Sequence, residues 1–368
     1  MEGSRNVFSE KLLDGIHSQE YINEILNYTN KLSSNHLPVI YSTKHLSLLL
    51  GIDYVDLKRI ITNRHKMYHF YQIKKKNGGN REISVPHKKL KYIQNWIKSN
   101  ILDQIVVEDN LYSHAYTKNK SIYTNALPHV NSEVVLNIDL KKFFDSITED
   151  RVWSFFKYIG YHSNLAVDLA KLCTNPISFR YFETFQEDEK EIFHHVFENR
   201  VGVLPQGAST SPSISNHICN RLDKRFHTYS LKNNIVYTRY SDDMTFSGNK
   251  SDIPRLAFIN KIINEEKFYI NENKVKYLPK GQRQIVTGLL VDDKVKVPKR
   301  FKKEIYRHLH FCIKFSPKVH FEYLAKRNGV EKGFQKEWLL GKIRYVYSIE
   351  QSEGVKMFKM FEKIKWEY

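Results

Sequence analysis

The chain has 368 residues, of which 41 % are apolar, so it is long for one compact domain and able to form real cores; we expect two or three packed subdomains. Its 58 Lys and Arg outnumber 40 Asp and Glu, for a net charge of +18, and with 23 Tyr and 22 Phe this favours a polyanion partner over a merely soluble basic surface. Three widely spaced cysteines exclude a disulfide framework and a zinc pattern, and we find no signal peptide or membrane-length apolar run, which predicts a cytosolic protein without a membrane partner.

Residues 1–64 predict a helical region, in which Ser42 is placed to cap a helix. We assign no chemistry to it, because packing explains its leucines as well as a nucleic-acid role would. Residues 68–85 then predict a β-hairpin around Asn77-Gly78-Gly79, with a strongly basic tip. This tip is either a solvated edge loop or a finger that lays Lys74 and Arg81 on a triphosphate, to which arginine makes forked contacts.

Residues 114–130 are less regular and carry Lys118 and Lys120. Asn125 and His129 in this stretch are either satisfied core residues or polar contacts to a ligand. The sequence alone leaves both interpretations open.

The stretch Val134–Leu140 predicts a buried strand that ends in Asp139. A carboxylate in such a place needs a partner, because taking a charge out of water is costly, and we favour metal ligation. Asp145, shortly after it, either ligates metal too or supports the turn. Ser146 to Glu149 matches a capping box and predicts that a helix opens there.

Residues 174–200 have mixed charge and Phe-rich pieces, which indicate an insertion or surface excursion. The Gly-, Pro- and Ser-rich stretch 202–212 predicts a loop, since Pro212 suits the first turn of the next helix. Gln206 and Gly207 lie in this loop, which either approaches a planar ligand or is a plain helix start.

Residues 235–248 predict a second hairpin, with Asp242 and Asp243 side by side at its tip. Adjacent carboxylates raise each other's pKa unless a cation neutralises them, and hard divalent cations prefer oxygen ligands. The alternative is an Asx turn that closes an ordinary hairpin. After this hairpin, residues 299–368 predict a helical region rich in Lys, Arg and aromatic residues.

Taken together, these motifs have the order found in fingers-palm-thumb polymerases. Asp139 with Phe144, Leu204-Pro-Gln-Gly207, Tyr240-Ser-Asp-Asp243 and Lys274 resemble the successive palm motifs of reverse transcriptases, over roughly residues 65–350. Asn125-Ala-Leu-Pro-His129 and Val286-Thr-Gly288 resemble patterns of the retron branch. Ser241 departs from the alanine that is usual there.

The resemblance implies an α+β, right-hand polymerase fold with fingers, a palm built on an antiparallel sheet with the Asp-Asp hairpin, and a helical thumb. The corresponding domains are an N-terminal helical region at 1–64, fingers at 65–133, a palm at 134–295 with an insertion at about 174–200, and a thumb or RNA-binding region at 296–368.

The resemblance also implies a function and partners. The enzyme would be a retron RNA-directed DNA polymerase that copies part of a cognate noncoding RNA into single-stranded DNA (msDNA) from dNTPs. Synthesis would start at the 2′-OH of an internal guanosine, as part of antiphage defence with an effector protein encoded nearby. A group II intron-like or diversity-generating enzyme and a noncatalytic RNA-binding scaffold are the alternatives, while Phe144 disfavours an RNA polymerase, which must admit a 2′-OH.

The roles that the resemblance implies fall into three groups. Two Mg²⁺ ions would be bound by the catalytic acids, with the Leu140 carbonyl as a further ligand: Asp139, Asp242 and Asp243. The incoming nucleotide would meet Phe144 at its sugar, with further contacts from Lys74, Arg81, Gln206 and Gly207, and with Lys274 as proton donor to pyrophosphate. RNA would be bound by Lys118, Lys120, Asn125, His129, Lys302, Lys303 and Arg307.

Overall fold

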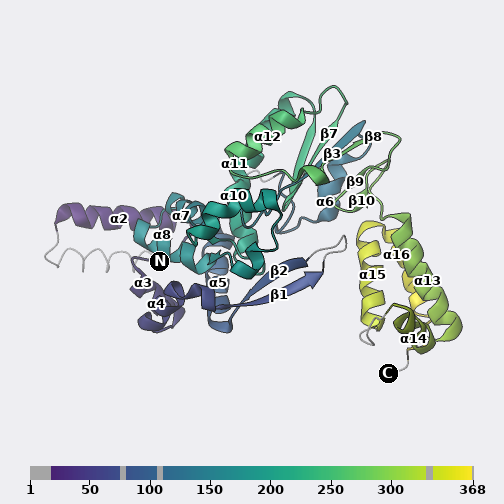
Figure 1. The fold of residues 1–368 in the computed structure, drawn as a ribbon, viewed down its shortest axis with the longest axis horizontal. Coiled ribbons are helices and arrows are strands. Elements are labelled where there is room, and N and C mark those ends of the chain that lie inside the picture. Colours follow the sequence, from purple (N-terminus) through teal and green to yellow (C-terminus); the bar gives the residue numbers. More distant parts are fainter. Residues whose placement is uncertain (1–17, 75–79, 106–110, 329–334, 367–368) are drawn as a thin grey trace. The chain divides into compact units, whose positions relative to one another are not determined.

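The computed structural model describes residues 18–74, 80–105, 111–328 and 335–366 (Figure 1). The chain forms two compact units, each assembled from distant segments. The first unit comprises Met1–Asn110, Leu140–Arg225 and Leu256–Ile270, and the second comprises Leu111–Asp139, Phe226–Arg255 and Asn271–Tyr368. The four-part division expected from the sequence cuts across these units and stays a prediction.

The first unit is mainly helical. Its helices outside residues 174–200 include α2 (Gln19–Ser34), α3 (Thr43–Leu50), α4 (Tyr54–Thr62), α5 (Lys88–Asn100), α7 (Glu149–Tyr158), α8 (Ser163–Cys173), α12 (Leu256–Glu265) and most of α11 (Ser211–Lys232). The Ser42 side chain accepts a hydrogen bond from the His45 amide at 3.1 Å, so the cap expected before α3 is confirmed. On α5, Leu90, Ile93 and Ile97 are fully buried, as their helical spacing predicts.

The predicted capping box is wrong in detail. Helix α7 starts at Glu149, and its N-cap residue Thr148 makes no side-chain cap bond. The Ser146 hydroxyl instead donates to the Lys142 carbonyl at 3.1 Å, and Glu149 forms an ion pair with Arg64. The Ser-x-x-Glu pattern therefore serves a turn and a tertiary contact, which local pattern reasoning does not see.

Two small antiparallel ladders complete the first unit. Strands β1 (Tyr68–Lys74) and β2 (Asn80–Pro86) form the predicted hairpin, whose tip at 75–79 lies outside the described residues. Strands β4 (Asn175–Pro176) and β5 (Gly202–Val203) pair with each other. Between β4 and β5 lie α9 (Phe179–Phe182) and α10 (Glu187–Glu198) in the stretch expected to be an excursion.

The second unit contains a four-stranded antiparallel sheet in the order β6-β7-β3-β8 (Figure 1). Its strands are β3 (Val134–Asp139), β6 (Val236–Tyr240), β7 (Asp243–Gly248) and β8 (Lys276–Pro279). Val134, Val135, Leu136 and Ile138 are buried, so β3 is the central apolar strand that its sequence predicts. Strands β7 and β8 both pair with β3, which ends in Asp139, and β6 pairs with β7.

The rest of the second unit is α6 (Ile122–Ala126), a short ladder of β9 (Ile285–Val286) and β10 (Leu289–Leu290), and four C-terminal helices. These helices are α13 (Lys299–Phe315), α14 (Pro317–Asn328), α15 (Gln335–Ile349) and α16 (Gln351–Phe361). Val286, Leu309 and Ile343 are among the buried residues that form one core across the ladder and the helices.

The three cysteines, Cys173, Cys219 and Cys312, are buried and unbridged, which confirms that they form no disulfide framework. None of the helices in the described ranges combines the length and the apolar character that a bilayer crossing requires.

Candidate active site

The three predicted acids gather at one end of the sheet in the second unit. Strand β3 ends at Asp139, which lies directly opposite Asp243 in the β3–β7 ladder. Strands β6 and β7 pair from Tyr240 and Asp243 onward, so Ser241 and Asp242 form the tight turn between them. Ser241 has φ +61°, the left-handed conformation that such a turn needs. The predicted hairpin with acids at its tip is confirmed.

The Asp139 carboxylate is held by a lysine from the loop before β8. Lys274 Nζ lies 2.8 and 3.0 Å from its two oxygens, and Asn271 donates to it at 3.2 Å. The Lys274 side chain is 59 % exposed while that of Asp139 is 13 % exposed, so the ammonium is the more accessible partner. This geometry allows Lys274 to exchange the carboxylate for solvent or for another anion.

Asp243 shows that this end of the sheet is short of positive charge. Desolvation, followed by the negative charges of Asp242 and Asp139, raises the pKa of Asp243 to about 7, against the opposing charges of Lys274 and Lys276. Because the residue as a whole is exposed, we give the like charges more weight than the burial. Oxygen donors that repel one another fit a hard divalent cation. No group of three His, Cys, Asp or Glu side chains in the described ranges is already arranged to hold one.

A buried arginine that sequence reasoning missed supports the acidic turn. Arg239, on β6, is fully buried and donates to the Ser241 carbonyl at 3.0 Å and to Ser113 Oγ at 3.2 Å. The Tyr116 hydroxyl lies 3.2 Å from Ser241 Oγ. A charged residue inside a β-branched and aromatic strand run was the one signal available. These bonds hold the backbone of the turn that carries Asp242.

In the first unit, Phe144 lies in the turn that follows Leu140. Leu140 is buried and forms an isolated bridge with Ile270, and Phe144 packs on Phe143 with ring centroids 5.3 Å apart. Phe143 in turn packs on Phe268 at 5.6 Å, so core aromatics lie behind the Phe144 ring.

The Gln206–Gly207 loop is joined to strand β2. The Ser84 amide donates to the Gln206 carbonyl at 2.8 Å. Gly207 has φ +128°, and a Cβ there would lie 2.8 Å from the Ser84 carbonyl oxygen. Glycine is required at this position by both the conformation and the close approach.

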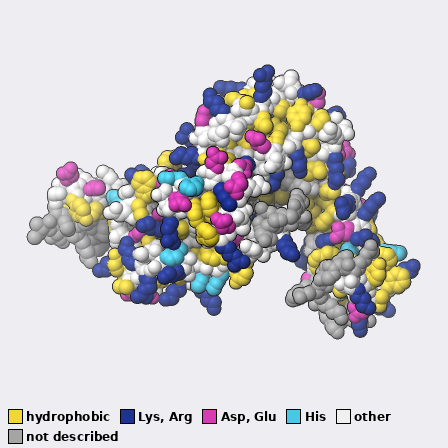
Figure 2. Space-filling view, viewed as in Figure 1, with side chains coloured by type: hydrophobic (Ala, Val, Ile, Leu, Met, Phe, Trp, Pro, Cys, Tyr) yellow, Lys and Arg dark blue, Asp and Glu magenta, His cyan; other side chains and the backbone are white. Residues whose placement is uncertain are grey.

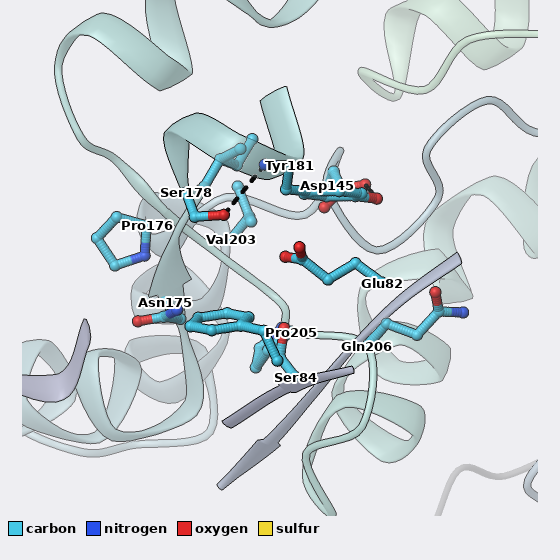
Figure 3. Close-up of a pocket in the computed structure, with 12 residues that line it drawn as sticks. Glu82, Ser84, Asp145, Asn175, Pro176, Ser178, Tyr181, Val203, Pro205 and Gln206 are labelled. Carbon is cyan, nitrogen blue, oxygen red and sulfur yellow. Dashed lines mark hydrogen bonds between the residues drawn. The ribbon is translucent and has the colours of Figure 1, made fainter. Parts of the chain in front are cut away.

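A pocket in the same unit is lined by residues from β2, the Phe144 turn, α9 and the Gln206 loop (Figure 3). Figure 3 shows Glu82 extending from β2 into it, with Tyr181 and Asp145 together on the far side. The Tyr181 hydroxyl donates to Asp145 at 3.0 Å. This bond favours the interpretation that Asp145 supports the turn.

The predicted triphosphate contacts, Lys74 and Arg81, are both exposed, but they do not share a face. The ladder pairs Lys74 with Asn80 and Arg81 with Ile73. Because side chains alternate along a strand, the two cations project from opposite faces of the ribbon. Each stays a separate proposal.

The comparisons with known proteins agree with this geometry. Residues 73–307 match the family described as "Reverse transcriptase (RNA-dependent DNA polymerase)". The chain is 32 % identical to the retron Ec86 reverse transcriptase of Escherichia coli, over 82 % of this chain and 87 % of that protein. It is 30 % identical to the retron Mx162 reverse transcriptase of Myxococcus xanthus, over 81 % of this chain and 64 % of that protein.

The chain belongs to the retron reverse transcriptases. It is an RNA-directed DNA polymerase, and the α+β, right-hand polymerase fold expected from the sequence is confirmed. Among solved structures it is similar to telomerase from Candida albicans in complex with the TWJ fragment of telomeric RNA. That similarity has a TM-score of 0.41 and 12 % identity, and it covers 79 % of this chain and 56 % of the telomerase chain.

Within this reverse transcriptase, two predicted RNA contacts are buried instead. His129 is fully buried, with Ser247 Oγ at 2.7 Å from Nδ1 and Thr238 Oγ1 at 2.8 Å from Nε2. Asn125 is 1 % exposed. His129 thus joins the turn after α6 to β6 and β7, whereas the buried side-chain amide of Asn125 has no hydrogen-bond partner within the described structure.

Lys302, a third predicted RNA contact, forms an ion pair within the fold. Lys302 Nζ lies 2.9 Å from both carboxylate oxygens of Glu350, and each side chain is only 16 % exposed. Lys303, Arg307 and Lys118 are exposed, while Lys120 donates to the Ser113 carbonyl at 3.0 Å. Lys and Arg side chains are spread over the visible face of the molecule (Figure 2). The basic surface therefore has other candidates besides Lys302.

Proposed function

We propose that this reverse transcriptase copies part of one cognate structured noncoding RNA into single-stranded DNA. Synthesis starts from the 2′-OH of an internal guanosine and gives a branched RNA–DNA hybrid, msDNA. The enzyme, its RNA and an effector protein encoded nearby form an antiphage defence system in the bacterial cytoplasm. Support comes from the retron relatives and from the positive charge of the chain. The observation that carries the catalytic part is the pairing of Asp139 with Asp243 beside Asp242.

The acids are the proposed catalytic residues. Asp139, Asp242 and Asp243, with the Leu140 carbonyl, would hold two Mg²⁺ ions, because neighbouring carboxylates repel one another and hard divalent cations prefer oxygen ligands. When bound, the ions stabilise the attacking and leaving oxygens of nucleotidyl transfer. Lys274 changes its partner from Asp139 to the pyrophosphate and donates a proton to it. Its exposed ammonium supports this role.

Nucleotide selection is proposed for residues of the first unit. The Phe144 ring presses against C2′ of the sugar and excludes a ribonucleotide. Gln206 and Gly207 line the incoming nucleotide, held in place by their junction with β2. Arg81 and Lys74, from opposite faces of the hairpin, are separate candidates for its phosphates.

The domain roles are proposed from the same motifs. Residues 65–133 act as fingers, 134–295 as the palm with its insertion at about 174–200, and 296–368 as the thumb that also selects RNA. Lys303 and Arg307, both exposed, are the proposed RNA contacts on the thumb, with Lys118 and Lys120 as a second basic group.

The nucleic acid that copurifies with the full chain tests this proposal. Purified wild-type protein and Asp242→Asn should carry the same small RNA when both samples are sequenced. On addition of dNTPs and Mg²⁺, only the wild type should add DNA, joined to a single guanosine 2′-OH that a debranching nuclease releases. A DNA product without that branch overturns the priming mode, and undiminished synthesis by Asp242→Asn overturns the metal-binding assignment.

A further inference from the structure

The turn at residues 141–145, which carries Phe144, is held by a segment that the proposed chemistry does not use. This α9–α10 segment, residues 174–200, contacts each charged residue of the turn. Lys141 forms an ion pair with Asp188, Lys142 Nζ lies 3.5 Å from Glu189, and Asp145 accepts the Tyr181 hydroxyl at 3.0 Å. The segment thus contacts the turn near both of its ends.

Lys142 is the most constrained residue of this turn. Its φ of +43° lies in the left-handed region, which a lysine adopts only when its surroundings compensate for the cost. Its ammonium lies 3.4 Å from the ring centroid of Phe185 and 4.8 Å from that of Tyr181, and its side chain is only 15 % exposed. The α9–α10 segment therefore provides the interactions that keep the turn in this conformation.

The segment is itself firmly built. Phe182 and Phe197 stack with ring centroids 4.1 Å apart, and Phe182, Phe185 and Phe193 belong to a separate small core. The β4–β5 ladder closes its two ends. Because the α9–α10 segment has its own core, it can hold the neighbouring turn within the small positional tolerance that substrate positioning needs.

The pocket in Figure 3 extends this support to the other nucleotide contacts. Glu82, from β2, and Asp145 line it together, and Ser84 of the same strand bonds the Gln206 loop. Burial raises the pKa of Asp145 to about 6, against the opposing effects of Lys142 and the Tyr181 bond. The Asp145 carboxyl oxygen accepts the hydrogen bond from the Tyr181 hydroxyl. Burial also raises the pKa of Tyr181, which stays a donor.

We propose that the α9–α10 segment sets the position of the Phe144 ring, and that Tyr181 and Lys142 are positioning residues for discrimination between deoxyribose and ribose. The inference rests on the proposed role of Phe144 as the sugar gate. It assigns a function to the stretch that the sequence marked only as an excursion. Loss of either positioning residue leaves the ring in place but less firmly held, so the site admits a 2′-OH more readily.

The test measures the ratio of kcat/KM for a dNTP to that for the matching rNTP, using the full-length enzyme on one template-primer. Tyr181→Phe removes a single hydroxyl, and Lys142→Met removes the charge but keeps the stem against Phe185. Removing one hydrogen bond, in Tyr181→Phe, or the charge that contacts Glu189 and two rings, in Lys142→Met, predicts a fall in the ratio of about three- to tenfold. The ratio does not depend on the fraction of folded enzyme, so a merely structural role would not change it.

Matched controls come from the same unit. Lys98→Met breaks the Lys98–Asp103 pair at the end of α5, outside the α9–α10 segment, and Tyr158→Phe removes a hydroxyl from a residue that is 85 % exposed. Both should keep the wild-type ratio. Phe144→Ala should lower the ratio by itself, and adding Tyr181→Phe to Phe144→Ala should change it no further, because the two act through one ring.

The possible failures are distinguishable. If Phe144→Ala lowers the ratio but Tyr181→Phe and Lys142→Met do not, the gate stands and the positioning role is wrong. If Phe144→Ala leaves the ratio unchanged, the gate itself is wrong and the inference fails with it. If the effect of Tyr181→Phe persists in the Phe144→Ala background, Tyr181 does not act through Phe144.

Discussion

The two units each contain a group of acidic side chains, and these groups differ in how their charge is balanced. In the second unit, Asp139 is paired with the exposed ammonium of Lys274, and Asp243 has a raised pKa beside the like charges of Asp242 and Asp139. In the first unit, burial also raises the pKa of Asp145, to about 6, but the groups that oppose this shift belong to the fold: the Tyr181 hydroxyl, which donates to the carboxylate, and the nearby charge of Lys142. A carboxylate with an exchangeable partner can accept a ligand, whereas one with internal partners holds its own chain in place.

The largest effect should separate the two groups directly. Asp139→Asn should reduce DNA synthesis by orders of magnitude, because it removes a ligand from the proposed metal site. Asp145→Asn should retain synthesis within about tenfold, because the amide oxygen still accepts the Tyr181 hydroxyl at a cost near that of one weakened hydrogen bond. The measurement is single-nucleotide extension of a generic primer with dNTP and Mg²⁺, normalised to folded protein.

Two results would break this comparison. Comparable losses in both variants would mean that Asp145 also takes part in the chemistry, as the sequence left open. Full activity in Asp139→Asn would mean that the end of the sheet is not the metal site.

A smaller effect concerns stability and pH. The folded-state pKa of Asp145 is raised from 3.8 to about 6, so ionising it costs folding free energy, and this cost grows as pH rises through that interval. Asp145→Asn removes this cost. At pH 8 its unfolding free energy should therefore exceed that of the wild type by about 1–2 kcal/mol, and it should unfold at a higher temperature. The difference in unfolding free energy between the variant and the wild type should be smaller at pH 5, where much of the wild-type carboxyl is already protonated in the folded state.

Thermal melts of both proteins at pH 5, 6 and 8 check the sign, with Asp150→Asn, an exposed residue on α7, as the control. A variant that is less stable than the wild type at pH 8 would show that Lys142 and Tyr181 more than compensate for the buried charge. In that case Asp145 would be retained for stability and not for positioning.

The sequence predicted features that depend on short stretches of chain. The hairpin with its acids, the basic hairpin and the Ser42 cap follow from alternation, turn residues and capping, which are local. Partners distant in sequence were not predictable. Glu149 bonds Arg64 instead of closing a capping box, and Arg239 is buried beneath the acidic turn.

The same limit explains the errors among the RNA contacts. The sequence left His129 open between a core residue and a ligand contact and placed Lys302 on the surface, because their partners Thr238, Ser247 and Glu350 lie far along the chain. A run of basic residues on an amphipathic helix does not indicate which of their side chains are buried in ion pairs. For α13, burial and ion pairing decide between Lys302 and its neighbours.

The smallest effect applies the comparison to these thumb cations. Lys302, paired with Glu350, should behave as a structural charge: Lys302→Gln should lower the unfolding free energy by about 1 kcal/mol and leave RNA affinity nearly unchanged. The double variant Lys303→Gln/Arg307→Gln changes only exposed residues. It should keep its stability, bind RNA a few-fold more weakly, and reduce the dependence of log affinity on log salt by about one for each phosphate that is no longer neutralised.

Competition at fixed salt between the cognate RNA and an unrelated hairpin of equal length separates selection from simple phosphate binding. If the thumb selects RNA, the double variant should lose more affinity for the cognate RNA, and priming on that RNA should suffer more than extension of a generic primer. Equal losses on both RNAs would make residues 296–368 a nonspecific duplex grip, since removing phosphate contacts weakens binding to all RNAs alike. RNA selection would then fall to the other exposed basic stretch, around Lys118.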